Sequence, residues 1–542
     1  MKEKLTKIVN SYTLILLGVF PLLIVHSYYD IQDVKMYLYL YATICAFLLV
    51  FGVRIRYALS GRDKRERGAS EGKGGAFKRI LGSLYPADFF AAVFFLVTAL
   101  STACSEWVYE AFWGNTARFQ GGFLWMWYIV TYFLISRHYV PKRFHMDIFL
   151  GAGVIVCAWG VLDYFSLSPI GVGYERLFSS TFGNINVLTA VEAMYLAAAS
   201  VMFLGTPAGD RKGCIRSLLY FLAAGICFMG LVCGRTANAV LSFGFLLCFL
   251  PFYAFRSRRG IVRYAGLVSC FLAVLLLVSV LTRAFPEYAC TPDYQGELAG
   301  LAVRHGRELA VLLAAAAVLT ALLFAVIRRG AGKDADASLQ AEFPGEKDRR
   351  IAKRLRILWA VLGLAAFCVL AFVFYDANLG GNAEKYAALS NYLVFDERWG
   401  TWRGYVWRLA MKYYREFSPL KKLIGSGPET FSVYVLIHDL NATLRRFDLN
   451  YDSMHNEWLQ HLFETGIIGF LSYYGMNAAC LAEAFTTPRR RPGDSTAALL
   501  AAAFGYALLV YLVQSFVNIS VPLILPLAMV CMSAAAAAGR NR

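Results

Sequence analysis

The sequence predicts an all-α polytopic membrane protein with about fourteen transmembrane helices and one large extracytoplasmic loop. Its 542 residues are 58% apolar, whereas a typical soluble domain is about 45–50% apolar. Charged residues make up 16%, compared with about 25% in soluble domains. This composition excludes a disordered chain, which needs low hydrophobicity. It also excludes an ordinary soluble enzyme, whose interior could not bury this much apolar surface.

Segments without Asp, Glu, Lys or Arg define the predicted membrane spans. A span needs about 20 mostly apolar residues. The segments are 8–29, 36–53, 89–105, 119–136, 148–162, 193–209, 217–234, 236–255, 264–282, 309–327, 357–375 and 465–482, followed by 495–539. The last segment is long enough for two spans, with a turn near residues 518–522. Because 148–162 and 193–209 are short, we expect polar residues such as Asp163 or Glu192 to extend them.

The basic residues predict the orientation of these spans. With both termini in the cytoplasm, the inner segments hold 36 of the 53 Lys and Arg residues, and ten of the other 17 lie in one long outer loop. Cytoplasmic loops are enriched in Lys and Arg, so this orientation is favoured. The net charge of +17 therefore indicates topology and contact with anionic lipid. We expect no nucleic-acid partner, because the basic residues are scattered over loops.

Three regions follow from this topology. Residues 1–375 hold spans one to eleven, with basic cytoplasmic loops at 54–88 and 328–356. Residues 376–464 form the large extracytoplasmic loop, and residues 465–542 hold spans twelve to fourteen. No nucleotide-binding motif, internal repeat or zinc-site spacing is visible, so we expect no cofactor and no metal.

The extracytoplasmic loop has the composition of a binding surface. It contains ten basic and eleven acidic residues and many aromatic ones, which suits contact with carbohydrate or lipid headgroups. Residues 399–417 carry apolar side chains at helical spacing and predict an amphipathic helix, on which Arg403 and Trp407 share a face. We expect His455 to begin a further helix that continues into the span at 465–482.

Four segments on the predicted outer face carry a family resemblance. They read GNTARFQG at 114–121, FGNIN at 182–186, RGYVWR at 403–408 with GSG at 425–427, and HNEWLQ at 455–460 with ETGIIG at 464–469. They resemble the G-T-x-x-R-x-x-G, F-G-N-P-N, R-x3-W-[KR] and HNEYLQ…ETGIIG motifs of the O-antigen ligase and Wzy-like polymerase superfamily. Ile185 replaces the usual Pro, and the turn around Arg235 departs from the family's Ser-Arg-Gly-like turn.

This resemblance, which covers about residues 85–530, implies both a fold and an activity. Such proteins resemble lipid-dependent (GT-C-like) glycosyltransferases and need no metal. They lie in the bacterial cytoplasmic membrane with the active site on its outer face. There they transfer glycan from an undecaprenyl-diphosphate carrier onto the hydroxyl group of a glycan, a glycolipid or a protein. The sequence does not distinguish ligase, polymerase and protein O-glycan transferase.

The residue chemistry agrees with this activity. A diphosphate leaving group needs positive charge, and arginine binds phosphate through bidentate hydrogen bonds. Arg403 and Arg235 are the first candidates for the diphosphate site. Arg118 and Arg408 are further candidates.

The acceptor hydroxyl needs a general base, for which histidine is suited. Five of the seven histidines can face outside: His26, His305, His438, His455 and His461. His455 is the candidate catalytic base, because it starts a helix beside the membrane within the aromatic and basic loop. Trp407, Glu457 and Trp458 are candidate contacts for acceptor or sugar, although Glu457 and a capping His455 would also suit a helix start with no catalytic role.

A polytopic transporter or flippase of polysaccharide or lipid-linked glycan is the alternative hypothesis. Transporters tend to show internal repeats and short loops, whereas this chain has no visible repeat and an outer loop of 89 residues. A purely structural role would leave the arginines and histidine of the outer face unexplained. We therefore favour a glycan transferase.

The orientation can be tested by cysteine labelling in intact cells. A cysteine placed at Asn382 or Asn441 should react with a membrane-impermeant thiol reagent, because both positions lie in the predicted outer loop. A cysteine placed within residues 62–74 should react only after the cells are opened, and the parent chain sets the background. Labelling at 62–74 in intact cells, with none at Asn382 or Asn441, would show that the predicted topology is inverted.

Overall fold

The computed structural model describes residues 1–25, 30–60, 84–116, 118–170, 179–289, 298–330, 346–447 and 451–540. All regular secondary structure in these ranges is helical, as the sequence predicts.

The helices before the outer loop are as follows. They are α1 (Lys2–Leu14), η1 (Ile15–Val19), α2 (Phe20–Leu22), α3 (Ile31–Leu59), α6 (Pro86–Ala103), α7 (Val108–Trp113), α8 (Gly122–His138), α9 (Arg143–Tyr164), α10 (Ile185–Gly205), α11 (Arg211–Cys233), α12 (Ala237–Ala254), α13 (Arg258–Ala284), α14 (Leu298–Arg304), α15 (Gly306–Gly330) and α17 (Glu346–Asn378).

The outer loop and the C-terminal region continue the helical chain. Their helices are η4 (Ala383–Leu389), α18 (Ser390–Leu393), α19 (Trp399–Glu416), α20 (Pro419–Ile424), α21 (Thr430–His438), α22 (Leu440–Phe447), α23 (Glu457–Arg490), α24 (Ser495–Gln514), η5 (Ser515–Val517) and α25 (Leu525–Gly539). The outer loop is therefore a set of short helices.

The helices support a polytopic membrane fold. Within the described ranges, eleven helices are long and apolar enough to cross a membrane, and they coincide with eleven of the predicted spans. The other three predicted spans correspond to α8 and α25, with 17 and 15 residues, and to α23, which bends at Gly466. The total of fourteen stays a prediction.

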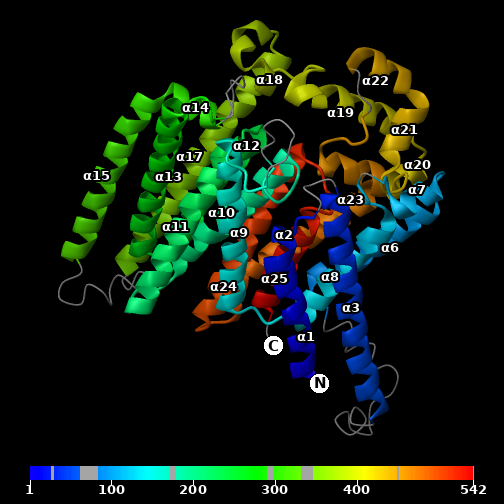
Figure 1. The fold of residues 1–542 in the computed structure, drawn as a ribbon, viewed down its shortest axis with the longest axis horizontal. Coiled ribbons are helices and arrows are strands. Elements are labelled where there is room, and N and C mark those ends of the chain that lie inside the picture. Colours follow the sequence, from blue (N-terminus) through cyan, green and yellow to red (C-terminus); the bar gives the residue numbers. More distant parts are fainter. Residues whose placement is uncertain are drawn as a thin grey trace.

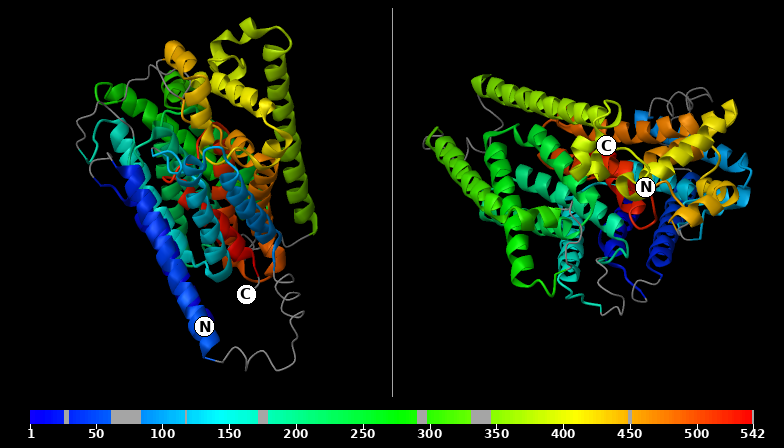
Figure 2. Two further views of the ribbon diagram at one scale, coloured as in Figure 1. Left: turned by 90° about the vertical axis from the view of Figure 1, so that its right-hand side faces the viewer. Right: turned by 90° about the horizontal axis from the view of Figure 1, so that it is seen from above.

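The arrangement of the helices agrees with the predicted orientation. Helices α18 to α22 gather at one end of the bundle, and both chain termini lie at the other end (Figure 1). Figure 2 shows the same separation from the side. The large loop and the termini therefore face opposite sides, as the distribution of Lys and Arg predicts.

Several helices extend beyond the uncharged segments. Helix α9 includes Asp163 and α10 includes Glu192, as expected for the two short segments. Helix α3 continues to Leu59 and α17 begins at Glu346, so the loops predicted at 54–88 and 328–356 are partly helical. Long charged side chains reach the headgroup region and allow helices to continue there. Residues 61–83 and 331–345 lie outside the described ranges.

The centre and the edge of the bundle differ in packing. All residues of α10 from Val187 to Met202 are buried, and its many alanines let neighbouring helices approach closely. By contrast, Leu364, Phe367 and Phe372 of α17 are each more than 60% exposed. Such an exposed apolar surface is suited to contact with lipid.

A backbone contact joins the outer loop to α23. The Ser426 amide donates a hydrogen bond to the Phe463 carbonyl at 3.1 Å. Gly425 and Gly466 have φ angles of +86° and +66°, which favour glycine. A Cβ atom at Gly425 would lie 2.1 Å from the Glu464 carbonyl oxygen. The two glycine motifs therefore form one interlocked turn, which docks α20 against the bend of α23.

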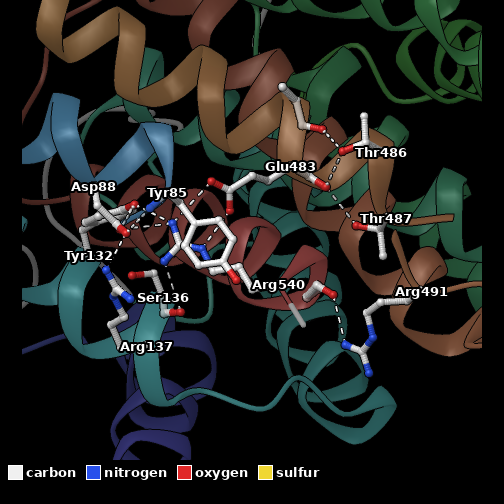
Figure 3. Close-up of polar contacts among 12 residues, drawn as sticks. Tyr85, Asp88, Tyr132, Ser136, Arg137, Glu483, Thr486, Thr487, Arg491 and Arg540 are labelled. Atoms are coloured by element: carbon white, nitrogen blue, oxygen red, sulfur yellow. Dashed lines mark hydrogen bonds and ion pairs between the residues drawn. The ribbon is translucent and has the colours of Figure 1, made fainter. Parts of the chain in front are cut away.

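A buried ion cluster anchors the C-terminus at the opposite end of the bundle (Figure 3). Arg540 pairs with Glu483 at 2.8 Å and with Asp88 at 3.1 Å. Arg137 also pairs with Asp88, which accepts a hydrogen bond from Tyr132. The cluster joins α6, α8, α23 and the end of α25, and its carboxylates are almost fully buried.

We expect the Arg540→Ala substitution to destabilise the protein. Removing one partner of a buried ion pair costs about 3–5 kcal/mol, because Glu483 would stay buried without its cation. Arg489→Ala is the matched control, since it removes the same charge from an exposed position. Thermal unfolding of the detergent-solubilised protein measures the difference. Equal unfolding temperatures for the two variants would contradict an anchoring role for the cluster.

Candidate active site

A cavity of about 540 Å³, hereafter the polar cavity, lies where the outer loop covers the ends of two spans. Its lining comes from the starts of α10, α12 and α19 and from the segment before α23. The described lining residues are Ile185, Asn186, Arg235, Thr236, Ala237, Asn238, Tyr392, Thr401, Trp402, Arg403, Val406, Tyr451 and His455. They include two arginines and one histidine, and none of them is acidic. The structure thus brings together Arg235, Arg403 and His455.

Two long helices begin at the polar cavity. The side chain of Asn184 caps α10 by accepting hydrogen bonds from the Asn186 and Val187 amides, and Thr236 caps α12 by accepting one from the Ala239 amide. Helix N-termini carry a partial positive charge and favour anions. They therefore add to the positive charge of the two arginines.

Arg235 lies in the short connection between α11 and α12. Its backbone has φ +52°, in the left-handed region that non-glycine residues rarely adopt. An arginine between two closely spaced spans is costly unless it faces water or an anion. The polar cavity provides a polar environment of this kind.

Arg403 is oriented by an unusual turn at the start of α19. Gly400, Thr401 and Trp402 all have positive φ angles, between +60° and +72°, so the regular part of the helix begins only at Arg403. The Nη1 atom of Arg403 donates a hydrogen bond to the Gly400 carbonyl at 2.6 Å. Its buried Nε atom has no hydrogen-bond partner in the described part of the chain, which leaves a donor for a ligand.

His455 lies two residues before the helix it was expected to begin. Helix α23 starts at Glu457, and Asn456 caps it by accepting a hydrogen bond from the Leu459 amide. The role of helix cap is therefore taken by Asn456. His455 itself has φ +48°, and its amide donates a hydrogen bond to the Ser453 hydroxyl.

The surroundings of His455 keep its imidazole neutral. Its pKa lies at about 4, below the usual value, mainly because burial disfavours the charged form. The positive charges of Arg403 and Arg118 lower the pKa as well, and the negative charge of Asp452 opposes them. Burial and the two arginines are therefore the cause of the neutral imidazole.

Backbone strain is concentrated at the polar cavity. Eight non-glycine residues in the described ranges have positive φ angles, and four of them line this cavity: Arg235, Thr401, Trp402 and His455. Such conformations cost about 1–3 kcal/mol each and cluster at functional sites. Their grouping favours a functional role for the polar cavity.

Arg118 is engaged with a residue that the sequence analysis missed. Its Nε and Nη2 atoms donate hydrogen bonds to both carboxylate oxygens of Asp452, at 3.0 and 2.6 Å. Neither residue is among those that line the polar cavity. Arg118 is therefore paired with Asp452 outside the lining of the polar cavity, and its contact with the diphosphate stays a prediction. The two residues are 334 positions apart, so no local pattern could reveal the pair.

A buried carboxyl group lies beside this pair. Burial raises the pKa of Glu429 to about 7, and the positive charge of Arg118 opposes that shift. The Gln460 amide donates hydrogen bonds to Glu429 and Glu464. The cluster joins the segment before α21 to the first turns of α23.

A second cavity of about 830 Å³, hereafter the aromatic cavity, contains three other predicted site residues. Trp407, Arg408 and Trp458 line it, together with Phe470 and Phe516. Arg403 and Trp407 are one turn apart in the regular part of α19, but Arg403 lines the polar cavity and Trp407 the aromatic cavity. The Trp407 indole donates a hydrogen bond to the Met454 carbonyl at 2.9 Å. Arg408 similarly donates to the Phe395 carbonyl at 2.8 Å.

Glu457 does not fit the acceptor contact predicted for it. It is buried, and it accepts hydrogen bonds from the Tyr473 and Tyr511 hydroxyls at 2.8 and 2.7 Å. The first turn of α23 points its side chain into the helix bundle. Glu457 therefore holds α23 and α24 together.

The other candidate histidines do not line the polar cavity. His461 is buried and packs on the Tyr473 ring, with ring centroids 4.1 Å apart. His438 is exposed on α21 and His305 lies between α14 and α15. His26 lies outside the described residues.

Two asparagines of the polar cavity were also missed as site residues, although both belong to motifs visible in the sequence. Asn186 is the last residue of FGNIN, and Asn238 follows Arg235 in GRTAN. The Asn238 side-chain amide lies 3.4 Å from the Asn186 side-chain oxygen. Their amides add neutral hydrogen-bonding groups near the two arginines. In the described residues, no group of three or more His, Cys, Asp or Glu side chains is placed to hold a metal ion.

Comparison with known families agrees with the sequence resemblance. Residues 298–474 match the family model described as O-antigen ligase, and the match includes Arg403, His455 and the interlocked glycine turn. It does not reach Arg118 or Arg235. No curated protein matches the chain. The family match supports the resemblance to the O-antigen ligase superfamily and a role as a membrane glycan ligase or polymerase. Such a role implies a lipid-linked glycan and an acceptor as substrates in general.

Proposed function

We propose that this member of the O-antigen ligase superfamily transfers glycan from an undecaprenyl-diphosphate carrier to an acceptor hydroxyl at the outer face of the bacterial cytoplasmic membrane. The observation that carries the proposal is the polar cavity, where His455, Arg235 and Arg403 meet. The acceptor is a glycan, a glycolipid or a protein.

The polar cavity suits the diphosphate of the donor. Two guanidinium groups and two helix N-termini face one space whose described lining has no acidic residue. Arginine holds phosphate oxygens through parallel hydrogen bonds, and the unpartnered Nε atom of Arg403 supplies one such donor. These groups stabilise the negative charge that grows on the diphosphate as its bond to the sugar breaks.

His455 is the proposed general base. Its neutral imidazole takes the proton from the acceptor hydroxyl as that oxygen attacks the anomeric carbon. The bond between this carbon and the diphosphate oxygen breaks, and its electron pair leaves with the diphosphate. A single displacement inverts the anomeric configuration, because no covalent glycosyl-enzyme intermediate forms.

The aromatic cavity suits an apolar portion of a substrate. It lies beside the polar cavity, since His455 lines one and Asn456 lines the other. Its tryptophan and phenylalanine rings offer apolar surface, and Arg408, Lys412 and Arg415 add positive charge. We propose that a lipid chain of the donor or acceptor lies here.

The reaction is proposed to be metal-independent, because Arg235 and Arg403 supply the positive charge at the diphosphate. The purified protein should therefore keep its activity in EDTA.

An assay with several acceptors distinguishes ligase, polymerase and protein transferase. The purified protein is supplied with carrier-linked glycan and with candidate glycan, glycolipid and protein acceptors, and the products are identified.

Arg403→Ala should lower the transfer rate about 10²–10³-fold, the usual effect of removing one donor to a developing negative charge. Arg403→Lys should restore only part of the rate, because lysine supplies charge without the planar fork. Arg408→Ala is the matched control on the same helix, and it should have a much smaller effect because Arg408 lines the aromatic cavity. Equal losses of transfer rate in Arg403→Ala and Arg408→Ala would contradict the assignment of the diphosphate to the polar cavity.

The pH dependence of transfer should report the pKa of His455. The neutral imidazole is the active form, so kcat/KM should stay level above about pH 5 and fall as the pH drops through about 4. In the residual activity of Arg403→Gln, the fall in kcat/KM at low pH should move to higher pH, because the substitution removes a positive charge that lowers the pKa of His455.

His455→Gln should lower the transfer rate about 10²–10⁴-fold, while His438→Ala should keep a rate near that of the parent. Substantial turnover by His455→Gln would exclude a base role.

A further inference from the structure

A second basic cavity lies at the other end of the bundle. It has a volume of about 570 Å³ and is lined by the end of α10 and by the α12–α13 and α23–α24 connections. They lie at the end of the bundle that holds both termini, which the charge-based topology places in the cytoplasm. Helix α10 has 21 residues, and a rise of 1.5 Å per residue places this basic cavity about 30 Å from the polar cavity.

Three arginines line the basic cavity. In the described residues, neither Arg256 nor Arg259 donates a side-chain hydrogen bond or forms an ion pair, although Arg256 lies over the Tyr253 ring at 5.3 Å. Arg491 donates to the Ala538 carbonyl at 3.1 Å (Figure 3). Arg491 also pairs with Asp494, the acidic residue in the described lining. The basic cavity therefore keeps an excess of positive charge.

Uncharged donors face the same space. Helices α13 and α24 begin here, capped by Ser257 and Asp494, and their N-termini favour an anion. Thr206 lines the cavity and is 1% exposed. Its hydroxyl has no hydrogen-bond partner in the described part of the chain. A buried hydroxyl without a partner is unfavourable, and a bound oxyanion would satisfy it.

Arg263 neutralises the partial negative charge at the C-terminal end of α10, which would otherwise repel an anion. The Arg263 guanidinium donates hydrogen bonds to the Phe203 and Thr206 carbonyls and to the Ser217 hydroxyl. These carbonyls belong to the last turn of α10 and the residue after it. The positive charges of Arg256 and Arg259 therefore stay available to a ligand.

We propose that the basic cavity binds the phosphate of an anionic phospholipid of the cytoplasmic leaflet. Basic pockets between helices on the cytoplasmic side bind such headgroups. The lining also contains Leu204, Ala254 and Leu499, at the ends of three apolar spans. A phosphate with attached acyl chains matches both the charge and the apolar walls, whereas free phosphate would use only the charge.

Native mass spectrometry of the detergent-solubilised full chain tests this. The probes are phosphatidylglycerol, phosphatidylcholine with the same acyl chains, and inorganic phosphate. Phosphatidylglycerol should bind most tightly. The Arg256→Ala/Arg259→Ala double variant should weaken its binding about 25-fold, since each basic residue near the surface contributes about fivefold. Arg489→Ala/Arg490→Ala is the matched control, because it removes the same charge from positions outside the lining, and it should bind within about twofold of the parent.

Thr206→Val gives a second test that keeps all the charges. It should weaken phosphatidylglycerol binding about tenfold, the value of a hydrogen bond to a charged group, and leave phosphatidylcholine binding unchanged. Equal loss in the two double variants would show diffuse surface attraction and overturn the proposal. If inorganic phosphate bound as tightly as phosphatidylglycerol, the ligand would be free phosphate and the lipid proposal would be overturned. Neither result would affect the transferase proposal, because these residues lie at the opposite end of the bundle.

Discussion

The interlocked turn between Gly425–Gly427 and the bend of α23 is the contact on which the candidate active site depends. Backbone meets backbone there, so a side chain at Gly425 or Gly466 would collide with a carbonyl group. Ser101 and Ser105 of the α6 region donate hydrogen bonds to the same two chain segments, at 2.7 Å each. Through α20 this contact positions α19, and with it Arg403, above the segment that carries His455.

The polar cavity combines strained backbone with groups that need a ligand. Arg235 and His455 hold left-handed conformations because capped helices start directly after each of them. The positive φ angles of Thr401 and Trp402 likewise turn Arg403 toward the cavity. Strain of this kind persists only where surrounding packing determines it. The rigid starts of α10, α12 and α23 provide that packing, so the cationic groups are held in place before a substrate arrives.

Helices α10 and α12 run between the polar cavity and the basic cavity, which lie at opposite ends of the bundle. Helix α10 begins at the polar cavity and ends at the cavity lined by Arg256 and Arg259. The buried ion cluster of Arg540, Glu483 and Asp88 lies at the same end of the bundle as the basic cavity. Arginines therefore line a cavity at each end of these helices.

The sequence by itself determined the helical membrane class and the motifs around Arg403 and His455, because apolar length and local spacing are properties of consecutive residues. Its basic loops predict the orientation. It also selected Arg235 as a candidate, because arginine binds phosphate through bidentate hydrogen bonds. Only the tertiary structure decided that Arg118 pairs with Asp452, that Arg408 and Trp407 face another cavity, and that Asn456 caps α23. These outcomes depend on contacts between distant segments and on the left-handed turn at Gly400, which helical spacing does not anticipate.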